Sequence, residues 1–113
     1  MMNLESLEAL DAFVSENPAA AVYFAGEQCQ VCQVMEPKVW ALLEERFPRI
    51  ARGRALAQAG GESTALAAQH RIFAVPTVLI FFEGRETFRY ARTFGLAEVE
   101  ADLSRPYGLF FDD

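Results

Sequence analysis

The groups in this sequence best suited to chemistry are two cysteines separated by two residues, Cys29 and Cys32. A pair with this spacing can cycle between a dithiol and a disulfide, or it can supply half of a tetrahedral zinc site. The chain has no other cysteine and its single histidine is His70, so the other half of a zinc site is missing and we expect neither metal nor cofactor. Because cysteine is common in protein cores, an inert buried pair stays open as an alternative.

The position of the pair in the chain favours redox chemistry. The apolar run 19–25 predicts a buried strand, and apolar residues at helical spacing over 29–47 predict a helix with Pro37 inside it. The pair therefore lies where a helix begins, and the unpaired N–H groups and helix dipole there stabilise an anion. We expect the pKa of Cys29 to lie below about 8.5, the usual value for a thiol. Cys29 is the candidate nucleophile, and Cys32 is the candidate resolving thiol.

The elements expected around the pair alternate between helix and strand and end in a hairpin and a helix. Alternation implies parallel crossovers, whereas two strands joined by the short turn Glu83-Gly84 are antiparallel. We therefore predict an α/β fold with a mixed central sheet and helices on both faces. In chain order the predicted elements begin with a helix that is capped by Asn3, starts at residue 4 and is stopped by Asn17-Pro18, followed by a strand over 19–25, a helix over 29–47 and a strand over 54–58. After a break at Gly60-Gly61 come a helix over 63–70, strands over 77–82 and 86–94, and a helix over 95–104 that ends before Pro106.

Length and composition limit the possible functions. A chain of 113 residues with 52% hydrophobic residues can build one core, so we expect a single domain over 1–113. Its net charge of −6 argues against nucleic acid as a partner. The longest apolar run, 78–82, is far shorter than the roughly 20 residues that cross a membrane, and residues 1–5 do not resemble a signal peptide. We expect a cytoplasmic protein that does not bind membranes.

The pattern of the whole chain resembles the thioredoxin family, and thioredoxin itself more than glutaredoxin. Five features carry the resemblance, in this order: the apolar strand 20–24 that leads into Cys29-Gln30-Val31-Cys32, Pro37 five residues after the second cysteine, Val75-Pro76-Thr77 before a strand, the hairpin turn Phe81-Phe82-Glu83-Gly84, and Gly95 before the last helix. The resemblance implies a thioredoxin-like fold with a cis peptide bond between Val75 and Pro76, beside the cysteines. It also implies that the backbone of Val75 pairs with an extended substrate segment.

The activity implied by the resemblance is reduction or exchange of disulfides through the Cys29/Cys32 dithiol. The substrates would be proteins or small molecules with a disulfide, and the electron donor would be a thioredoxin-reductase-like enzyme or another dithiol. The expected substrate-binding residues are Gln28, Ala74, Val75 and Pro76.

The sequence departs from the family at the active site. Thioredoxins usually carry Trp-Cys-Gly-Pro-Cys, whereas Gln28 precedes the atypical Cys-Gln-Val-Cys motif here. The family's buried aspartate aligns with Tyr23, and its partner lysine falls near Ala57. Tyr23 and Glu27 are the candidates for proton transfer, with Glu36 as a further carboxylate. These departures keep a second function open, a thioredoxin-like module that binds a protein partner with weak or no redox turnover.

Residues 105–113 form an aromatic tail beyond the last family element. The tail contains Tyr107, Phe110 and Phe111. We expect these rings to fold back onto the domain and leave a monomer. If they were exposed, they would form an apolar patch of the kind that marks an interface, and a homodimer through the tail is the alternative.

Overall fold

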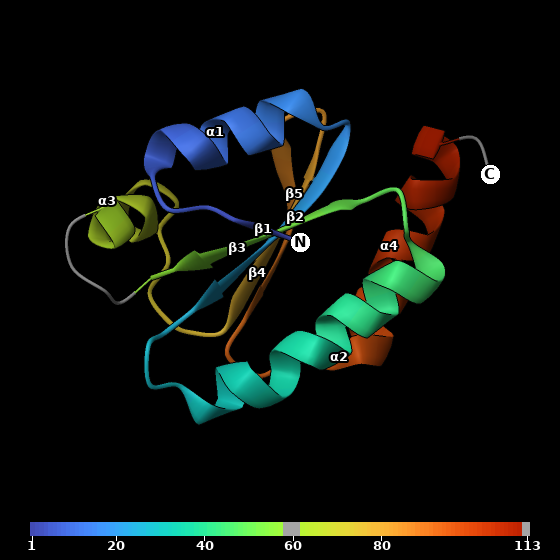
Figure 1. Ribbon diagram of the computed structural model, residues 1–113. Helices are drawn as coiled ribbons and strands as arrows, with labels where there is room; N and C mark the ends of the chain where they lie inside the picture. The colour runs from blue at the N-terminus through green and yellow to red at the C-terminus, as the bar shows by residue number, and fades with distance from the viewer. Residues whose placement is uncertain (58–61, 112–113) are drawn as a thin grey trace.

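A five-stranded sheet between two pairs of helices makes up the computed structural model of the protein, which describes residues 1–57 and 62–111 (Figure 1). Gln58 of the predicted strand, the break at Gly60-Gly61 and the last two residues of the tail lie outside the described residues. None of the described helices is long and apolar enough to cross a membrane. The elements are β1 (Met2–Asn3), α1 (Leu7–Glu16), β2 (Ala19–Ala25), α2 (Gln30–Arg46), β3 (Ala51–Leu56), α3 (Glu62–Gln69), β4 (Thr77–Phe82), β5 (Arg85–Ala91) and α4 (Leu96–Phe111).

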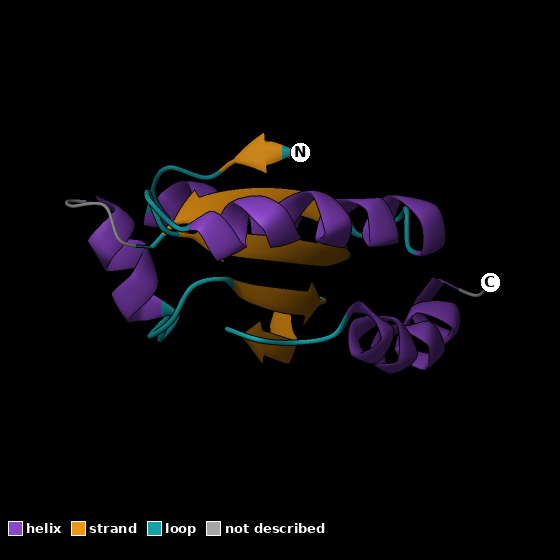
Figure 2. Cartoon of the chain, turned by 90° about the horizontal axis from the view of Figure 1, so that it is seen from below, coloured by secondary structure: helices purple, strands orange, loops and turns teal. Residues whose placement is uncertain are grey.

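The sheet is mixed, as the sequence predicts. Its strand order is β1-β3-β2-β4-β5, with β2 parallel to β3 and antiparallel to β4. The hairpin β4–β5 closes one side, and the two-residue strand β1 pairs in parallel with β3 at the other edge (Figure 2). The predicted α/β fold class is therefore confirmed.

The central strand β2 builds a core on each face of the sheet. Every one of its residues is buried, because α1 and α3 cover one face while α2 and α4 cover the other (Figure 1). Successive side chains of a strand point to opposite faces, so Tyr23 joins the core under α2 and α4, whereas Phe24 joins the core under α1. The start of α2 is thus held over the carboxyl end of a fully buried strand.

The first helix begins later than predicted. Ser6, and not Asn3, is the N-cap of α1, and its hydroxyl oxygen accepts a hydrogen bond from the backbone N–H of Ala9 at 3.1 Å. Asn3 belongs to β1, and the N–H of Leu4 donates to the carbonyl of Arg54 at 2.7 Å. Pairing with β3 keeps this segment extended, so the predicted start at residue 4 is wrong.

Strand β3 runs over Ala51–Leu56, three residues earlier at its start than the predicted 54–58. Gly53 lies inside it, and a Cβ atom there would stand 2.8 Å from Leu4 Cδ1 and 2.9 Å from Phe13 Cε2. The glycine therefore marks a close approach of two side chains to the strand backbone and does not interrupt it.

The last helix does not end before Pro106, as predicted, but continues through it to Phe111. A proline inside a helix costs about 3 kcal/mol because it lacks the N–H donor. Burial of the Tyr107 side chain offsets that cost: its ring packs edge-on against Phe47 at 5.1 Å between centroids, and its hydroxyl accepts a hydrogen bond from the N–H of Arg49 at 3.1 Å. Residues 105–111 of the aromatic tail thus fold back onto the domain, as the last turns of α4.

Candidate functional site

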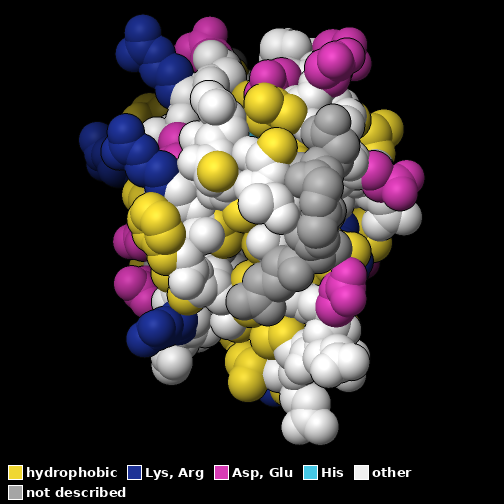
Figure 3. Space-filling view, turned by 90° about the vertical axis from the view of Figure 1, so that its left-hand side faces the viewer, with side chains coloured by type: hydrophobic (Ala, Val, Ile, Leu, Met, Phe, Trp, Pro, Cys, Tyr) yellow, Lys and Arg dark blue, Asp and Glu magenta, His cyan; other side chains and the backbone are white. Residues whose placement is uncertain are grey.

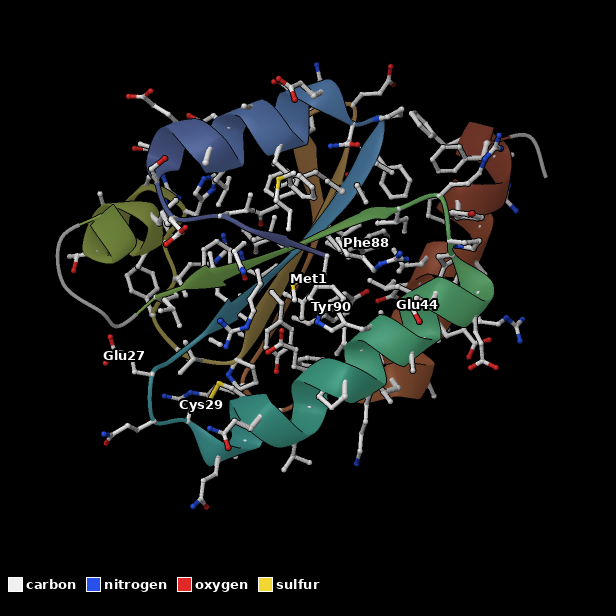
Figure 4. The ribbon with its side chains drawn as sticks, viewed as in Figure 1. Met1, Glu27, Cys29, Glu44, Phe88 and Tyr90 are labelled. Atoms are coloured by element: carbon white, nitrogen blue, oxygen red, sulfur yellow. A yellow bond between two sulfur atoms is a disulfide. The ribbon has the colours of Figure 1, made fainter. Side chains whose placement is uncertain are left out.

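Cys29 and Cys32 form a disulfide at the start of α2, with their Cα atoms 5.2 Å apart (Figure 4). Cys29 is the N-cap residue of this helix, and its sulfur accepts a hydrogen bond from the N–H of Cys32 at 3.1 Å. Cys29 is partly exposed, whereas only 2% of Cys32 is accessible. An attacking group outside the protein can therefore reach Cys29 but not Cys32.

A groove of about 500 Å³ opens beside the disulfide. The peptide bond between Val75 and Pro76 is cis, and both residues line the groove together with Cys29. Besides these three, the residues that line the groove are Gln28, Gln30, Val31, Arg92 and Thr93. The segments around residues 28–31, 75–76 and 92–93, far apart in the chain, thus meet at one site.

Three of the four expected substrate-binding residues line this groove, namely Gln28, Val75 and Pro76. Ala74 does not line it, and its carbonyl accepts a hydrogen bond from the Thr77 hydroxyl at 2.7 Å. In residues 1–57 and 62–111, no backbone hydrogen bond engages the N–H or the carbonyl of Val75. Its peptide groups are therefore available to an extended chain laid in the groove.

Tyr23 lies beneath the disulfide, fully buried, and its hydroxyl donates a hydrogen bond to the Cys32 carbonyl at 3.0 Å. Burial raises the pKa of Tyr23 to about 12; the nearby Glu36 carboxylate adds to this shift and the Arg54 guanidinium opposes it. Tyr23 therefore stays protonated at neutral pH and ties the first turn of α2 to β2. The other proton-transfer candidate, Glu27, is exposed on the loop before α2, and its side chain points away from the disulfide (Figure 4).

The side chain of Glu36, one helical turn after Cys32, is only 14% exposed. Both of its carboxylate oxygens accept from Arg54 Nε at 3.0 Å, and Oε2 also accepts from the Trp40 indole N–H at 3.0 Å. The rings of Trp40 and Tyr23 lie 5.8 Å apart. We call Tyr23, Glu36, Trp40 and Arg54 the Glu36 cluster. Sequence reasoning named Glu36 but missed Arg54, which lies on β3, 18 residues further along the chain.

His70 lies away from this site, on the opposite face of the sheet. Its ring packs against Phe24 and Phe81, with centroids 6.3 and 6.2 Å away. Burial lowers the pKa of His70 below its usual value, although the Asp11 and Glu86 carboxylates oppose that shift. In the described residues no group of three or more histidine, cysteine, aspartate or glutamate side chains could hold a metal ion.

The chain is similar to thioredoxin-like proteins in sequence and in fold. No family model matches the sequence. The chain is 30% identical over 110 residues to the thioredoxin-like protein YdfQ of Bacillus subtilis (strain 168), a match that covers 97% of this chain and 95% of that protein.

Solved structures of thioredoxins share the fold. Fasciola hepatica thioredoxin superposes with a TM-score of 0.79 at 22% identity, covering 93% of this chain and 98% of that one. A mutant thioredoxin from Halobacterium salinarum gives a TM-score of 0.78 at 24% identity, and the match covers 94% of this chain and 88% of that one. Thioredoxin 1 of Thermosipho africanus gives a TM-score of 0.69 at 29% identity, and the match covers 80% of this chain and 96% of that one. With a relative this similar over nearly its whole length and a cysteine pair at disulfide distance at the start of α2, the chain belongs to the thioredoxin-like family.

Proposed function

We propose that this protein is a thiol-disulfide oxidoreductase that reduces disulfides in proteins or small molecules through the Cys29/Cys32 dithiol. The observation that supports this most strongly is the setting of Cys29. Its sulfur caps the N-terminus of α2, accepts a backbone hydrogen bond, and opens on the groove beside Pro76. These features favour a thiolate at a position that a substrate can reach.

The proposed reaction consists of two exchange steps. The Cys29 thiolate attacks one sulfur of the substrate disulfide, a mixed disulfide forms, and the other substrate sulfur leaves as a thiolate that takes a proton from water. Cys32, once deprotonated, then attacks the sulfur of Cys29; the bond to the substrate breaks and the second substrate thiol leaves. Two electrons pass from the dithiol to the substrate. A thioredoxin-reductase-like enzyme or another external dithiol returns them.

Within this reaction Tyr23 and Glu27 have different parts. Tyr23 positions Cys32, because its hydroxyl holds the Cys32 carbonyl and remains protonated at neutral pH. Glu27 is exposed on the loop before α2 and its side chain points away from the disulfide, so the part that we propose for it is indirect: water carries the proton of the resolving thiol between Cys32 and this carboxylate. A reducing compartment such as the cytoplasm suits this chemistry, because the pair would be kept as a dithiol.

The experiment that tests the proposal is the reduction of insulin by dithiothreitol, followed by the turbidity of the released chains. We expect the wild type to accelerate the reaction and the Cys29→Ser variant to leave it at the uncatalysed rate. Equal rates for the two proteins would reject the proposal.

A partner-binding module with weak or no turnover is the second candidate. It draws support from Tyr23, because a phenol with a pKa of about 12 stands where thioredoxins carry a buried acid. If the protein is a partner-binding module, the Cys29→Ser variant binds the partner as well as the wild type does, although neither the wild type nor the variant reduces insulin.

A further inference from the structure

The groove beside the disulfide has a single charged residue among its described lining residues, Arg92. The remaining lining side chains are amides, a hydroxyl, apolar groups and Cys29 itself. This local positive charge contrasts with the net charge of −6 of the whole chain. A substrate that enters the groove therefore meets a cation within the same small site as the reactive sulfur.

The backbone fixes Arg92 at this place. Strand β5 ends at Ala91, which pairs with Thr77, and the N–H of Arg92 then donates to the carbonyl of Pro76 at 2.7 Å. Arg92 is thus bonded to a residue that lines the groove together with Cys29. This hydrogen bond holds the backbone of Arg92, the first residue after β5, beside the cis peptide bond.

The conformation of Arg92 is one that glycine would adopt more easily. Its φ is 63°, in the left-handed region, where a side chain is disfavoured. Among the residues that the structure describes, two other non-glycine residues have positive φ, Arg71 and Glu83, and both lie in turns outside the groove. The groove therefore carries a cation at a backbone position where glycine would relieve strain, which points to a use for that cation.

The charge of Arg92 is not neutralised within the described part of the chain. The side chain is exposed, and it takes part in none of the ion pairs or side-chain hydrogen bonds found there. By contrast, Arg89, three residues earlier and within β5, pairs with Glu86 at 2.9 Å. Figure 3 shows the end of the molecule that carries α3, where basic side chains lie along the left-hand edge of the view and acidic ones are more scattered. Arg92 is thus left to bind an anionic group of a substrate.

We propose that Arg92 is a specificity-determining residue that selects disulfide substrates with an acidic side chain next to the reactive cysteine. The guanidinium would pair with the carboxylate of a segment laid along Val75, and it would repel a lysine or arginine at the same position. This inference rests on the proposed reductase function and names its substrate class.

A different effect of Arg92 must be separated from this one. A cation near Cys29 also stabilises its thiolate, which would raise the rate with every substrate by the same factor. Selection, in contrast, changes the ratio between substrates of opposite charge. The ratio is therefore the quantity to measure.

The test uses three peptides that share one disulfide-linked neutral fluorescent reporter and differ in the residue next to the cysteine, which is Glu, Gln or Lys. We expect the wild type to give kcat/KM values in the order Glu, Gln, Lys, with a Glu-to-Lys ratio of about tenfold at low ionic strength. The ratio should fall towards one in 0.5 M salt, because the Debye length shortens from about 30 Å at 0.01 M ionic strength to less than about 10 Å above 0.1 M.

Variants of Arg92 complete the experiment. The Arg92→Gly variant suits the left-handed backbone, so it keeps the fold and should bring the ratio to about one, and Arg92→Glu should invert it. The matched control is Arg105→Ala, which removes an exposed arginine of α4 outside the groove and should keep the wild-type ratio. If the wild type reduces all three peptides equally, or if Arg92→Gly slows all three by one factor, selection by Arg92 is overturned while the reductase function stands. If the wild type reduces none of them, the proposed function itself fails.

Discussion

The backbone N–H of Cys32 points at the sulfur of Cys29, with 3.1 Å between the two atoms. The two residues that close the disulfide are therefore also joined as donor and acceptor of an N-cap hydrogen bond. When the disulfide is reduced, the same N–H faces the sulfur on which negative charge develops. The dipole of α2, a helix of 17 residues, acts in the same direction.

The first prediction concerns the acidity of Cys29. The hydrogen bond and the helix dipole both stabilise the thiolate, so the pKa should lie below the usual value of about 8.5. The measurement is the rate of iodoacetamide alkylation against pH in the reduced Cys32→Ser variant, where Cys29 is the sole thiol. We expect a midpoint below pH 8. A midpoint at that of free cysteine would show that the helix terminus does not activate this residue.

The second prediction concerns the Glu36 cluster. In the Glu36→Gln variant Arg54 loses its charged partner, and we expect the free energy of unfolding to fall by about 1 kcal/mol. The emission of Trp40, the sole tryptophan, should also change, because its indole N–H donates to this carboxylate. Urea denaturation followed by fluorescence measures both effects.

The matched control for Glu36 is Glu44→Gln, which removes an exposed carboxylate from the same helix. We expect that variant to change stability by less than about 0.5 kcal/mol, as surface substitutions usually do. If the two variants behave alike, the Glu36 cluster does not stabilise α2 against the sheet.

Sequence patterns predicted those elements whose signals are local. Strand β2 has the predicted bounds because seven apolar residues end at clear breaks, and the hairpin follows from Glu83-Gly84 between two predicted strands, although the second strand ends at Ala91 and not at the predicted residue 94. Strand β1 was missed because two residues have no period of their own; only pairing with β3 makes them a strand. Likewise, Pro106 remains helical because the contact of Tyr107 with the distant Phe47 outweighs the tendency of proline to end a helix.

The third prediction concerns pH. His70 is the sole histidine, its Nε2 is buried without a hydrogen-bond partner in the described structure, and burial lowers its pKa. A histidine whose pKa is lower in the folded state than its unfolded value of about 6.5 stabilises the fold above that pH, and the contribution is lost as pH falls below it.

Urea denaturation between pH 7.5 and 5.5 measures this effect. We expect the wild type to lose stability over that range and the His70→Phe variant, which keeps the ring contacts with Phe24 and Phe81, to lose less. Parallel curves for the two proteins would assign the pH dependence to other groups.

The fourth prediction concerns the end of α4. Replacing Tyr107 by alanine should cost about 3 kcal/mol, because the buried ring leaves a cavity beside Phe47 and Arg49 loses the acceptor for its N–H. Leu109→Ala, two residues away, removes a side chain that is 72% exposed and should cost less than about 0.5 kcal/mol. Thermal unfolding of both variants checks the contrast; equal losses would mean that the last turns of α4 are not packed as described.

The candidate site was only partly predictable. The spacing of the cysteines and the strand before them placed the disulfide, and the family resemblance placed the cis bond before Pro76. Arg92 gave no such signal, because it lies 60 residues or more from both cysteines and reaches the groove only through the β4–β5 hairpin. Arg54 was missed for the same reason, since its partner Glu36 lies on another element.

The most direct test of the central claim is to trap the mixed disulfide. The reduced Cys32→Ser variant is mixed with a disulfide-containing peptide, and intact mass with peptide mapping locates the adduct. We predict one adduct per protein, on Cys29, that forms faster than on free cysteine and persists because the resolving thiol is gone. Absence of an adduct on Cys29, or equally fast formation on Cys32 in the Cys29→Ser variant, would contradict the assignment of Cys29 as the nucleophile.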